Sequence, residues 1–166
     1  MKKILLISTG GTFNKSYDSI KGTLMIDNKA TALYDIATRW LCDFDIKTII
    51  DKDSLDMNDE DRELLLHTIM DANEEYIIII HGTDTMDQSA SVVADANLSK
   101  KIIFTGSMVP YSINPVEATA NLSSAWGYLQ AEEKSGVYIA MNSRVGRYEM
   151  IEKDRVQGRF VEKVLV

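Results

Sequence analysis

Hydroxyl side chains lie beside glycines at two places in the sequence, each directly after a run of apolar residues. The first place is Thr9-Gly10-Gly11-Thr12, and the second is His81-Gly82-Thr83-Asp84-Thr85. A threonine hydroxyl is a weak nucleophile unless a neighbouring base takes its proton. Thr83 with Asp84 beside it would form such a set with a lysine whose pKa is lowered by burial. Local composition alone does not name that lysine.

The apolar runs before these segments predict the strands that would position them. Ile4–Ile7 and Ile77–Ile80 are nearly continuous aliphatic runs, as in parallel strands that are buried on both faces. In an open α/β sheet, the carboxyl ends of the strands form the ligand crevice. We therefore expect both threonine segments to lie at one edge of one sheet.

Alternating strand and helix patterns extend over most of the chain and predict a doubly wound, mostly parallel α/β sheet of the Rossmann-like or flavodoxin-like type. Strands are expected at 3–8, 45–50, 76–80, 101–105 and 137–141, and helices at 28–41, from 58 onward, at 85–97 and at 115–133. Asn28 and Asn58 are the expected caps of the first two helices. The second helix is expected to bury Leu64, Leu65, Ile69 and Met70.

Two segments do not follow this alternation. Residues 12–22 are polar and end in a glycine, which favours a mobile surface loop that is either a plain connection or a lid over the crevice. Residues 142–166 carry short mixed segments punctuated by Gly146 and Gly158, and here we expect short extended pieces with a hairpin.

Composition narrows the classes of function. The 166 residues suit one domain over 1–166, and the net charge of −7 argues against nucleic acid or an anionic membrane as the main partner. A single cysteine, Cys42, excludes an intrachain disulfide. The two histidines lack ligand spacing for a metal, and Gly10-Gly11 is not a dinucleotide fingerprint, so neither metal nor cofactor is expected. The start is interpreted as a strand rather than a signal peptide, and a cytoplasmic, soluble protein is expected.

At this point the motifs resemble those of the L-asparaginase/glutaminase family. Both threonine segments look like the two threonine-bearing signatures of that family. Further matches follow in the family's order: Asp53-Ser54-Leu55-Asp56-Met57-Asn58 resembles its serine-containing substrate loop, Gly106-Ser107-Met108-Val109-Pro110 its G-[SA]-M-x-P turn, Met141-Asn142 its Met-Asn strand end, and Lys153 lies at the spacing of its lysine. The resemblance implies the fold of the asparaginase N-terminal domain over nearly the whole chain.

The resemblance also implies roles for individual residues. Thr12 would attack the side-chain amide of asparagine to form an acyl-enzyme, and Thr83, Asp84 and Lys153 would activate the nucleophile or the hydrolytic water. Ser54 would bind the substrate α-carboxylate, while Asp84 would hold the α-ammonium group. The Thr83 N–H and the carbonyl side of Ser107 would line the amide pocket, with Gly11 and Gly82 in the substrate-binding set. Tyr17 would be the lid tyrosine.

Departures from the family pattern keep an alternative open. The smaller second domain of the family would be absent, Leu55 stands where the secreted enzymes usually have a polar residue, and Glu152 precedes Lys153. Both the missing domain and Leu55 would remove contacts to the α-ammonium group. The rival interpretation is therefore a weakly active or inactive amino-acid-binding or regulatory module. In either case self-association as a homodimer is expected.

Simpler interpretations apply to the single residues as well. Thr12 and Thr83 could be ordinary turn residues, and Asp84 could simply cap the following helix. Lys153 could be a solvated surface lysine.

Overall fold

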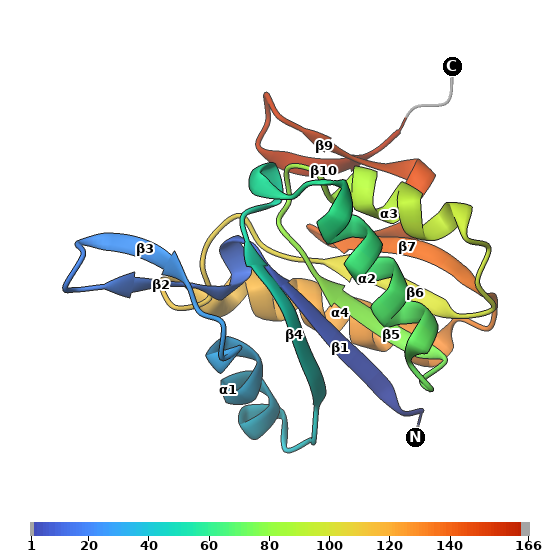
Figure 1. Ribbon diagram of the computed structural model, residues 1–166, viewed down its shortest axis with the longest axis horizontal. Coiled ribbons are helices and arrows are strands. Elements are labelled where there is room, and N and C mark those ends of the chain that lie inside the picture. The colour runs from blue at the N-terminus through green and yellow to red at the C-terminus, as the bar shows by residue number, and fades with distance from the viewer. Residues whose placement is uncertain (1, 164–166) are drawn as a thin grey trace.

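A six-stranded sheet organises residues 2–163, the part of the chain that the computed structural model describes (Figure 1). Its strands lie in the order β4-β1-β5-β6-β7-β8. They span Ile4–Gly10 (β1), Asp45–Lys52 (β4), Tyr76–Ile80 (β5), Lys101–Thr105 (β6), Gly136–Met141 (β7) and Arg144–Arg147 (β8). All neighbours pair in parallel except β7 and β8. The five parallel strands thus have the flavodoxin-like order 2-1-3-4-5, which confirms the predicted fold class.

Helices cover both faces of this sheet. One face carries α1 (Thr31–Trp40) and α4 (Pro115–Ala131), and the other carries α2 (Asp59–Asp71) and α3 (Met86–Asp95). Consecutive isoleucines of β5 point to opposite faces, so Ile77 and Ile79 pack on the α2/α3 side while Ile78 and Ile80 pack on the α1/α4 side. All four are fully buried, which explains the uninterrupted aliphatic run.

Two helix predictions need correction. In α2 only Leu65 and Ile69 of the four expected apolar residues are buried, because Leu64 and Met70 lie toward solvent with exposed fractions of 46% and 51%. Asn28 does not cap α1, since that helix begins at Thr31. The Asp27 carboxylate instead accepts hydrogen bonds from the backbone N–H groups of Lys29 and Thr31, and Thr31 is the first residue of α1. The Asn58 prediction is confirmed by a capping box with Asp61.

The segment expected as a mobile loop contains a β-hairpin. Its strands are β2 (Lys15–Asp18) and β3 (Thr23–Ile26), and they pair antiparallel with Tyr17 opposite Leu24. The Asp18 carboxylate accepts N–H bonds from Ile20 and Lys21 and organises the turn. The hydrogen bonds of Asp18 and the positive φ of Gly22, 67°, allow a tight turn, so this polar segment forms a hairpin rather than an irregular loop. The hairpin extends away from the body of the molecule (Figure 1).

The tail forms the expected hairpin within the described residues, whereas residues 164–166 lie outside them. Strand β9 (Ile151–Asp154) pairs antiparallel with β10 (Arg159–Glu162), and a short 3-10 helix, η3 (Tyr148–Met150), precedes them. Ile151 and Phe160 are buried in the core on the α2/α3 side. The Phe160 N–H donates to Asn142 Oδ1 at 2.9 Å, which ties the hairpin to the end of β7.

No helix within residues 2–163 is both long and apolar enough to cross a membrane.

Candidate active site

The two threonine segments meet at the carboxyl ends of β1 and β5, which are neighbours in the sheet. This is the point where the strand order reverses, the usual ligand position in an open α/β sheet. The Thr9 hydroxyl donates to the Ile80 carbonyl at 2.9 Å. A Cβ on Gly11 would lie 2.6 Å from the Gly82 nitrogen, so the loops cross backbone against backbone. Thr12, which opens the 3-10 helix η1 (Thr12–Asn14), therefore lies beside the loop of Thr83.

Lys153 reaches this edge from the β9–β10 hairpin. Its Nζ donates to Thr83 Oγ1 at 2.8 Å and to Asp84 Oδ1 at 2.9 Å. The side chains of Lys153 and Asp84 are 16% and 34% exposed, so the ion pair is partly shielded from water. A pocket of about 190 Å³ borders all three residues. The structure thus assembles a hydroxyl, an amine and a carboxylate in contact.

Ser54 lies at the start of a second 3-10 helix, η2 (Ser54–Asp56), just past β4. Its buried Oγ accepts N–H bonds from Asp84 and Thr85 at 3.2 and 3.4 Å. The Thr85 hydroxyl in turn donates to the Ser54 carbonyl at 2.8 Å. Thr85 is the residue that precedes α3, so Ser54 sits at the positive end of that helix. Because Oγ accepts both amide bonds, its own proton is left for a further acceptor.

The structure does not show Asp84 as the cap of α3. The N-cap position of α3 is Thr85, and no side chain caps the helix there. The Asp84 carboxylate is engaged by Lys153 instead.

Two other predicted residues, Ser107 and Tyr17, are not part of the hydrogen-bonded set of Thr83, Asp84 and Lys153. Ser107, past the end of β6, is fully buried, and its hydroxyl donates to the Val109 carbonyl at 2.7 Å. This leaves the backbone of Ser107, rather than its hydroxyl, to line a site. Tyr17 is on β2, and its side chain is 66% exposed on the extended hairpin (Figure 1). Tyr17 does not line the pocket beside Thr83, Asp84 and Lys153.

His81 was considered from the sequence only as a metal ligand, but it braces the loop of Thr83. The ring is completely buried, and burial lowers its pKa from 6.5 to about 4, so it is neutral at pH 7. Nδ1 lies 2.7 Å from the Gly82 carbonyl and must be the donor there. Nε2 is then the acceptor for the Ser89 hydroxyl at 2.8 Å. This pair fixes the peptide between Gly82 and Thr83.

Arg155 was also missed by sequence reasoning. Its Nη2 donates to the Asp84 carbonyl at 2.7 Å, which latches the β9–β10 turn onto the loop before α3. An exposed arginine two positions beyond Lys153 carries no motif that could have identified it. Contacts of this kind depend on how the hairpin folds back.

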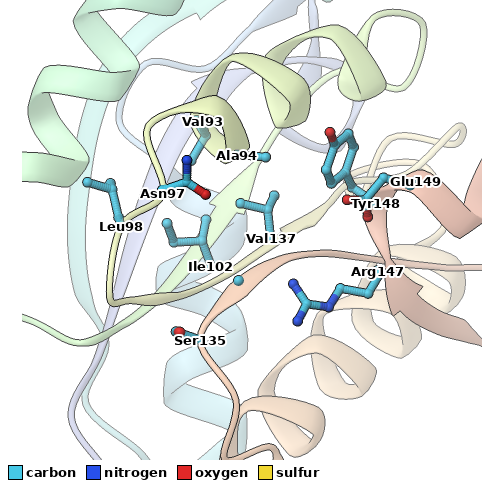
Figure 2. A pocket seen from close by; sticks show the side chains of 11 residues that line it. Val93, Ala94, Asn97, Leu98, Ile102, Ser135, Val137, Arg147, Tyr148 and Glu149 are labelled. Atoms are coloured by element: carbon cyan, nitrogen blue, oxygen red, sulfur yellow. The ribbon is translucent and has the colours of Figure 1, made fainter.

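A separate pocket of about 210 Å³ lies at the opposite edge, near the amino ends of β6 and β7. Figure 2 shows Ile102 and Val137 on its floor and the Arg147 side chain extending toward it. None of the predicted site residues lines this pocket. Across residues 2–163, no three His, Cys, Asp or Glu side chains are placed to hold a metal ion.

Comparison with known proteins identifies what this arrangement resembles. The family model described as "Asparaginase, N-terminal" matches residues 3–159. The L-asparaginase of Thermococcus kodakarensis is 28% identical over 149 residues, which cover 86% of this chain and 45% of that protein. The chain therefore spans less than half the length of this curated relative.

Solved structures agree in fold. The thermostable L-asparaginase from Thermococcus kodakarensis superposes with a TM-score of 0.83 at 23% identity, covering 96% of this chain and 51% of the other. A probable cytoplasmic L-asparaginase from Campylobacter jejuni has a TM-score of 0.78 at 25% identity, covering 98% and 53%.

Proposed function

The chain belongs to the asparaginase family, and from this premise we propose that it hydrolyses the side-chain amide of asparagine or of a related small amide, with release of ammonia. The main support is the contact of Lys153 with both Thr83 Oγ1 and Asp84 at the edge that Thr12 shares. If Thr83 were only a turn residue, it would not need a hydrogen bond from a partly buried lysine on the β9–β10 hairpin.

In the proposed reaction Thr12 is the nucleophile. Its Oγ1 bonds to the amide carbon, and the C–N bond then breaks, so that the proton lost by the hydroxyl leaves with the departing ammonia. Water adds to the resulting acyl-enzyme, releases the carboxylic acid and restores the Thr12 hydroxyl. Lys153, Thr83 and Asp84 form the hydrogen-bonded path along which these protons move.

The surrounding groups would hold the substrate. The Thr83 N–H faces away from the Gly82 carbonyl that His81 fixes, and it is proposed as a donor to the developing oxyanion, a contact typically worth ~3 kcal/mol in the transition state. Ser54 is proposed for the α-carboxylate, and Asp84 for the α-ammonium group. The crossing of Gly11 and Gly82 allows the close approach of backbone that this pocket needs.

An ammonia-release assay with asparagine, glutamine and other small amides tests this proposal. Thr12→Ala should lower turnover by at least ~10³-fold, because the nucleophile is removed. Thr38→Ala, at an exposed position on α1, is the matched control and should leave turnover unchanged. Unchanged turnover in Thr12→Ala would show that the nucleophile is wrong, whatever the substrate.

A second candidate function, an amino-acid-binding or regulatory module, is favoured by Leu55. This apolar side chain follows Ser54 and is 69% exposed, so it offers no polar contact to a substrate ammonium group. This alternative would be supported if the protein binds aspartate saturably and shows no turnover that Thr12→Ala abolishes. Weak turnover abolished by Thr12→Ala would support the enzyme.

Assembly, domain organisation and location are further parts of the proposal. Tyr17, Ile20, Leu24 and Met25 are exposed on one hairpin, which is consistent with self-association as a homodimer. Light scattering that shows a monomer at concentrations of tens of micromolar would count against it.

We propose residues 1–166 as one domain, for which limited proteolysis should leave no smaller stable fragment. Cell fractionation tests the proposed cytoplasmic location.

A further inference from the structure

Arg62 is a buried arginine without a close carboxylate partner. It lies in the first part of α2 and is 7% exposed. The nearest carboxylate oxygen in an ion pair with it, on Asp59, is 3.9 Å away on a fully exposed side chain. Its Nε has no hydrogen-bond partner among the described residues. A buried guanidinium usually has a paired anion, because removing its charge from water is costly.

The hydrogen bonds of Arg62 converge on the loop that carries Ser54. Nη1 donates to the Met57 carbonyl at 3.2 Å, and Met57 is the residue that ends η2. Nη2 donates to Thr85 Oγ1 at 3.3 Å, and this hydroxyl donates onward to the Ser54 carbonyl. Nη2 also contacts Gln88 Oε1 at 3.4 Å. These acceptors are all neutral, so no hydrogen bond to a carboxylate balances the positive charge, which interacts only at longer range with Asp59 and Asp61.

One helix end adds to the positive potential at this place. Thr85, which Arg62 contacts, is at the amino end of α3, and such an end carries partial positive charge. The amino end of α2 carries Asp59, Glu60 and Asp61 and so makes no comparable contribution. An anion placed beside Ser54 would be attracted by the amino end of α3 and by the guanidinium.

Three nearby carboxylates are engaged by other cations. Asp61 pairs with Lys52 at 2.8 Å and Asp53 with Lys15 at 2.7 Å. Asp84 pairs with Lys153 at 2.9 Å. The Arg62 charge also acts on His81. Burial lowers the pKa of His81, and the positive charge of Arg62 lowers it further, whereas the negative charges of Asp87 and Asp53 raise it.

We propose that Arg62 is a positioning residue that supplies the counter-charge for the α-carboxylate of the substrate, acting through Thr85 and the Ser54 loop. The inference rests on the proposed function and deepens it. The contribution of Arg62 is therefore confined to amides that carry a free α-carboxylate. Similar amides without that carboxylate should gain nothing from Arg62.

A pair of substrates isolates this effect. L-Asparagine carries the carboxylate, whereas 3-aminopropanamide presents the same amide and amine without it. Arg62→Met should raise KM for L-asparagine by about tenfold or more, the usual loss for a charge-assisted contact. It should leave kcat within a few-fold and alter kcat/KM for 3-aminopropanamide little. Arg62→Lys keeps the charge and should restore most of the L-asparagine affinity.

The control is Arg39→Met, which removes an exposed arginine from α1 and should leave KM and kcat/KM unchanged for both substrates. An equal loss of kcat/KM for both substrates in Arg62→Met would overturn the proposal, because a merely structural role predicts that result. Should Arg62→Met fail to fold, Thr85→Val carries the test. It removes the hydroxyl between Arg62 and Ser54 and should raise KM selectively for L-asparagine.

Titration calorimetry with L-aspartate separates this inference from the proposed function. If the wild-type chain turns over neither substrate, the proposed function fails. Weaker L-aspartate binding in Arg62→Met or Thr85→Val would then still support the counter-charge. Equal binding in wild type and variants, or no binding to the wild type, would overturn it.

Discussion

Lys153 donates a hydrogen bond to Thr83 Oγ1 at 2.8 Å although 70 positions separate the two residues in the chain. The lysine comes from an antiparallel hairpin outside the main sheet, and the threonine comes from the loop after its central strand β5. The hairpin is held in place by the buried side chains of Ile151 and Phe160. Proton transfer at the proposed site therefore depends on how the hairpin packs on the α2/α3 side.

Lys153→Met should lower kcat for asparagine by at least ~10²-fold, because it removes the amine that links Thr83 to Asp84. KM should rise much less, since no contact of Lys153 with the substrate is proposed. Steady-state kinetics measure both quantities. Lys134→Met, at an exposed position before β7, is the control. A change in KM alone would contradict the assigned role.

Gly11→Ala should destabilise the protein by more than about 2 kcal/mol and abolish turnover. Gly11 has φ 76° and ψ 179°, a region that is essentially reserved for glycine, and a Cβ would lie 2.6 Å from the Gly82 nitrogen. Urea unfolding measures the loss. The control is Gly127→Ala within α4, where a Cβ would meet no atom within 4 Å. That variant should stabilise the helix by about 0.5–1 kcal/mol.

Tyr17→Ala tests the lid role. Because the Tyr17 side chain is 66% exposed, its loss should change the unfolding free energy by less than about 0.5 kcal/mol. If the hairpin closes over bound substrate, kcat should nevertheless fall by ~10-fold or more. Tyr34→Ala on α1, where the side chain is 54% exposed, is the matched control for both measurements. Normal turnover in Tyr17→Ala would remove the lid role from this residue.

His81 should make stability depend on pH between about 4 and 6.5. Burial lowers its pKa to about 4 in the folded protein, so the unfolded chain binds the proton first as pH falls below 6.5. Its stabilising contribution is complete above pH 6.5 and is lost as pH falls toward 4, a change of about 3 kcal/mol.

The measurement is urea unfolding of wild type and His81→Gln at several pH values. The variant should lack most of this slope, whatever its absolute stability. Asp53 and Asp61 have pKa values held below 3.8 by the hydrogen bonds and charges of Lys15 and Lys52, despite the opposing effect of burial. Their contribution falls away at lower pH than that of His81. Parallel slopes in the two proteins between pH 4 and 6.5 would contradict the prediction.

Local sequence was sufficient for the five parallel strands of the main sheet and for its helices, whereas the antiparallel edge strand β8 was not predicted as part of this sheet. An apolar run such as Ile77–Ile80 favours a strand that is covered on both faces, and Asn58 with Asp61 forms a capping box from neighbouring residues. The β2–β3 hairpin was not predicted, because its strands are short and largely exposed and so lack a hydrophobic alternation. The exposed Leu64 and Met70 show that an apolar residue does not by itself reveal which way it faces.

The motifs around Thr12 and Thr83 were visible in the sequence because each follows a strand and is contiguous in the chain. Roles that depend on direction were not visible. The Ser107 hydroxyl turns back to Val109, the His81 ring braces the Gly82 carbonyl, and Arg155 reaches the Asp84 carbonyl. Each of these facts depends on a side-chain rotamer or on a contact between distant segments.

The sequence by itself determined the alternation of the five parallel strands with the helices and the residue types at one edge of the sheet, because both follow from short-range patterns of apolar and polar residues. Only the tertiary structure decided that Lys153 reaches Thr83 and that the Arg62 charge lies behind the Ser54 loop. These contacts join segments far apart in the chain, and their geometry is set by the packing of whole elements, which no local pattern encodes.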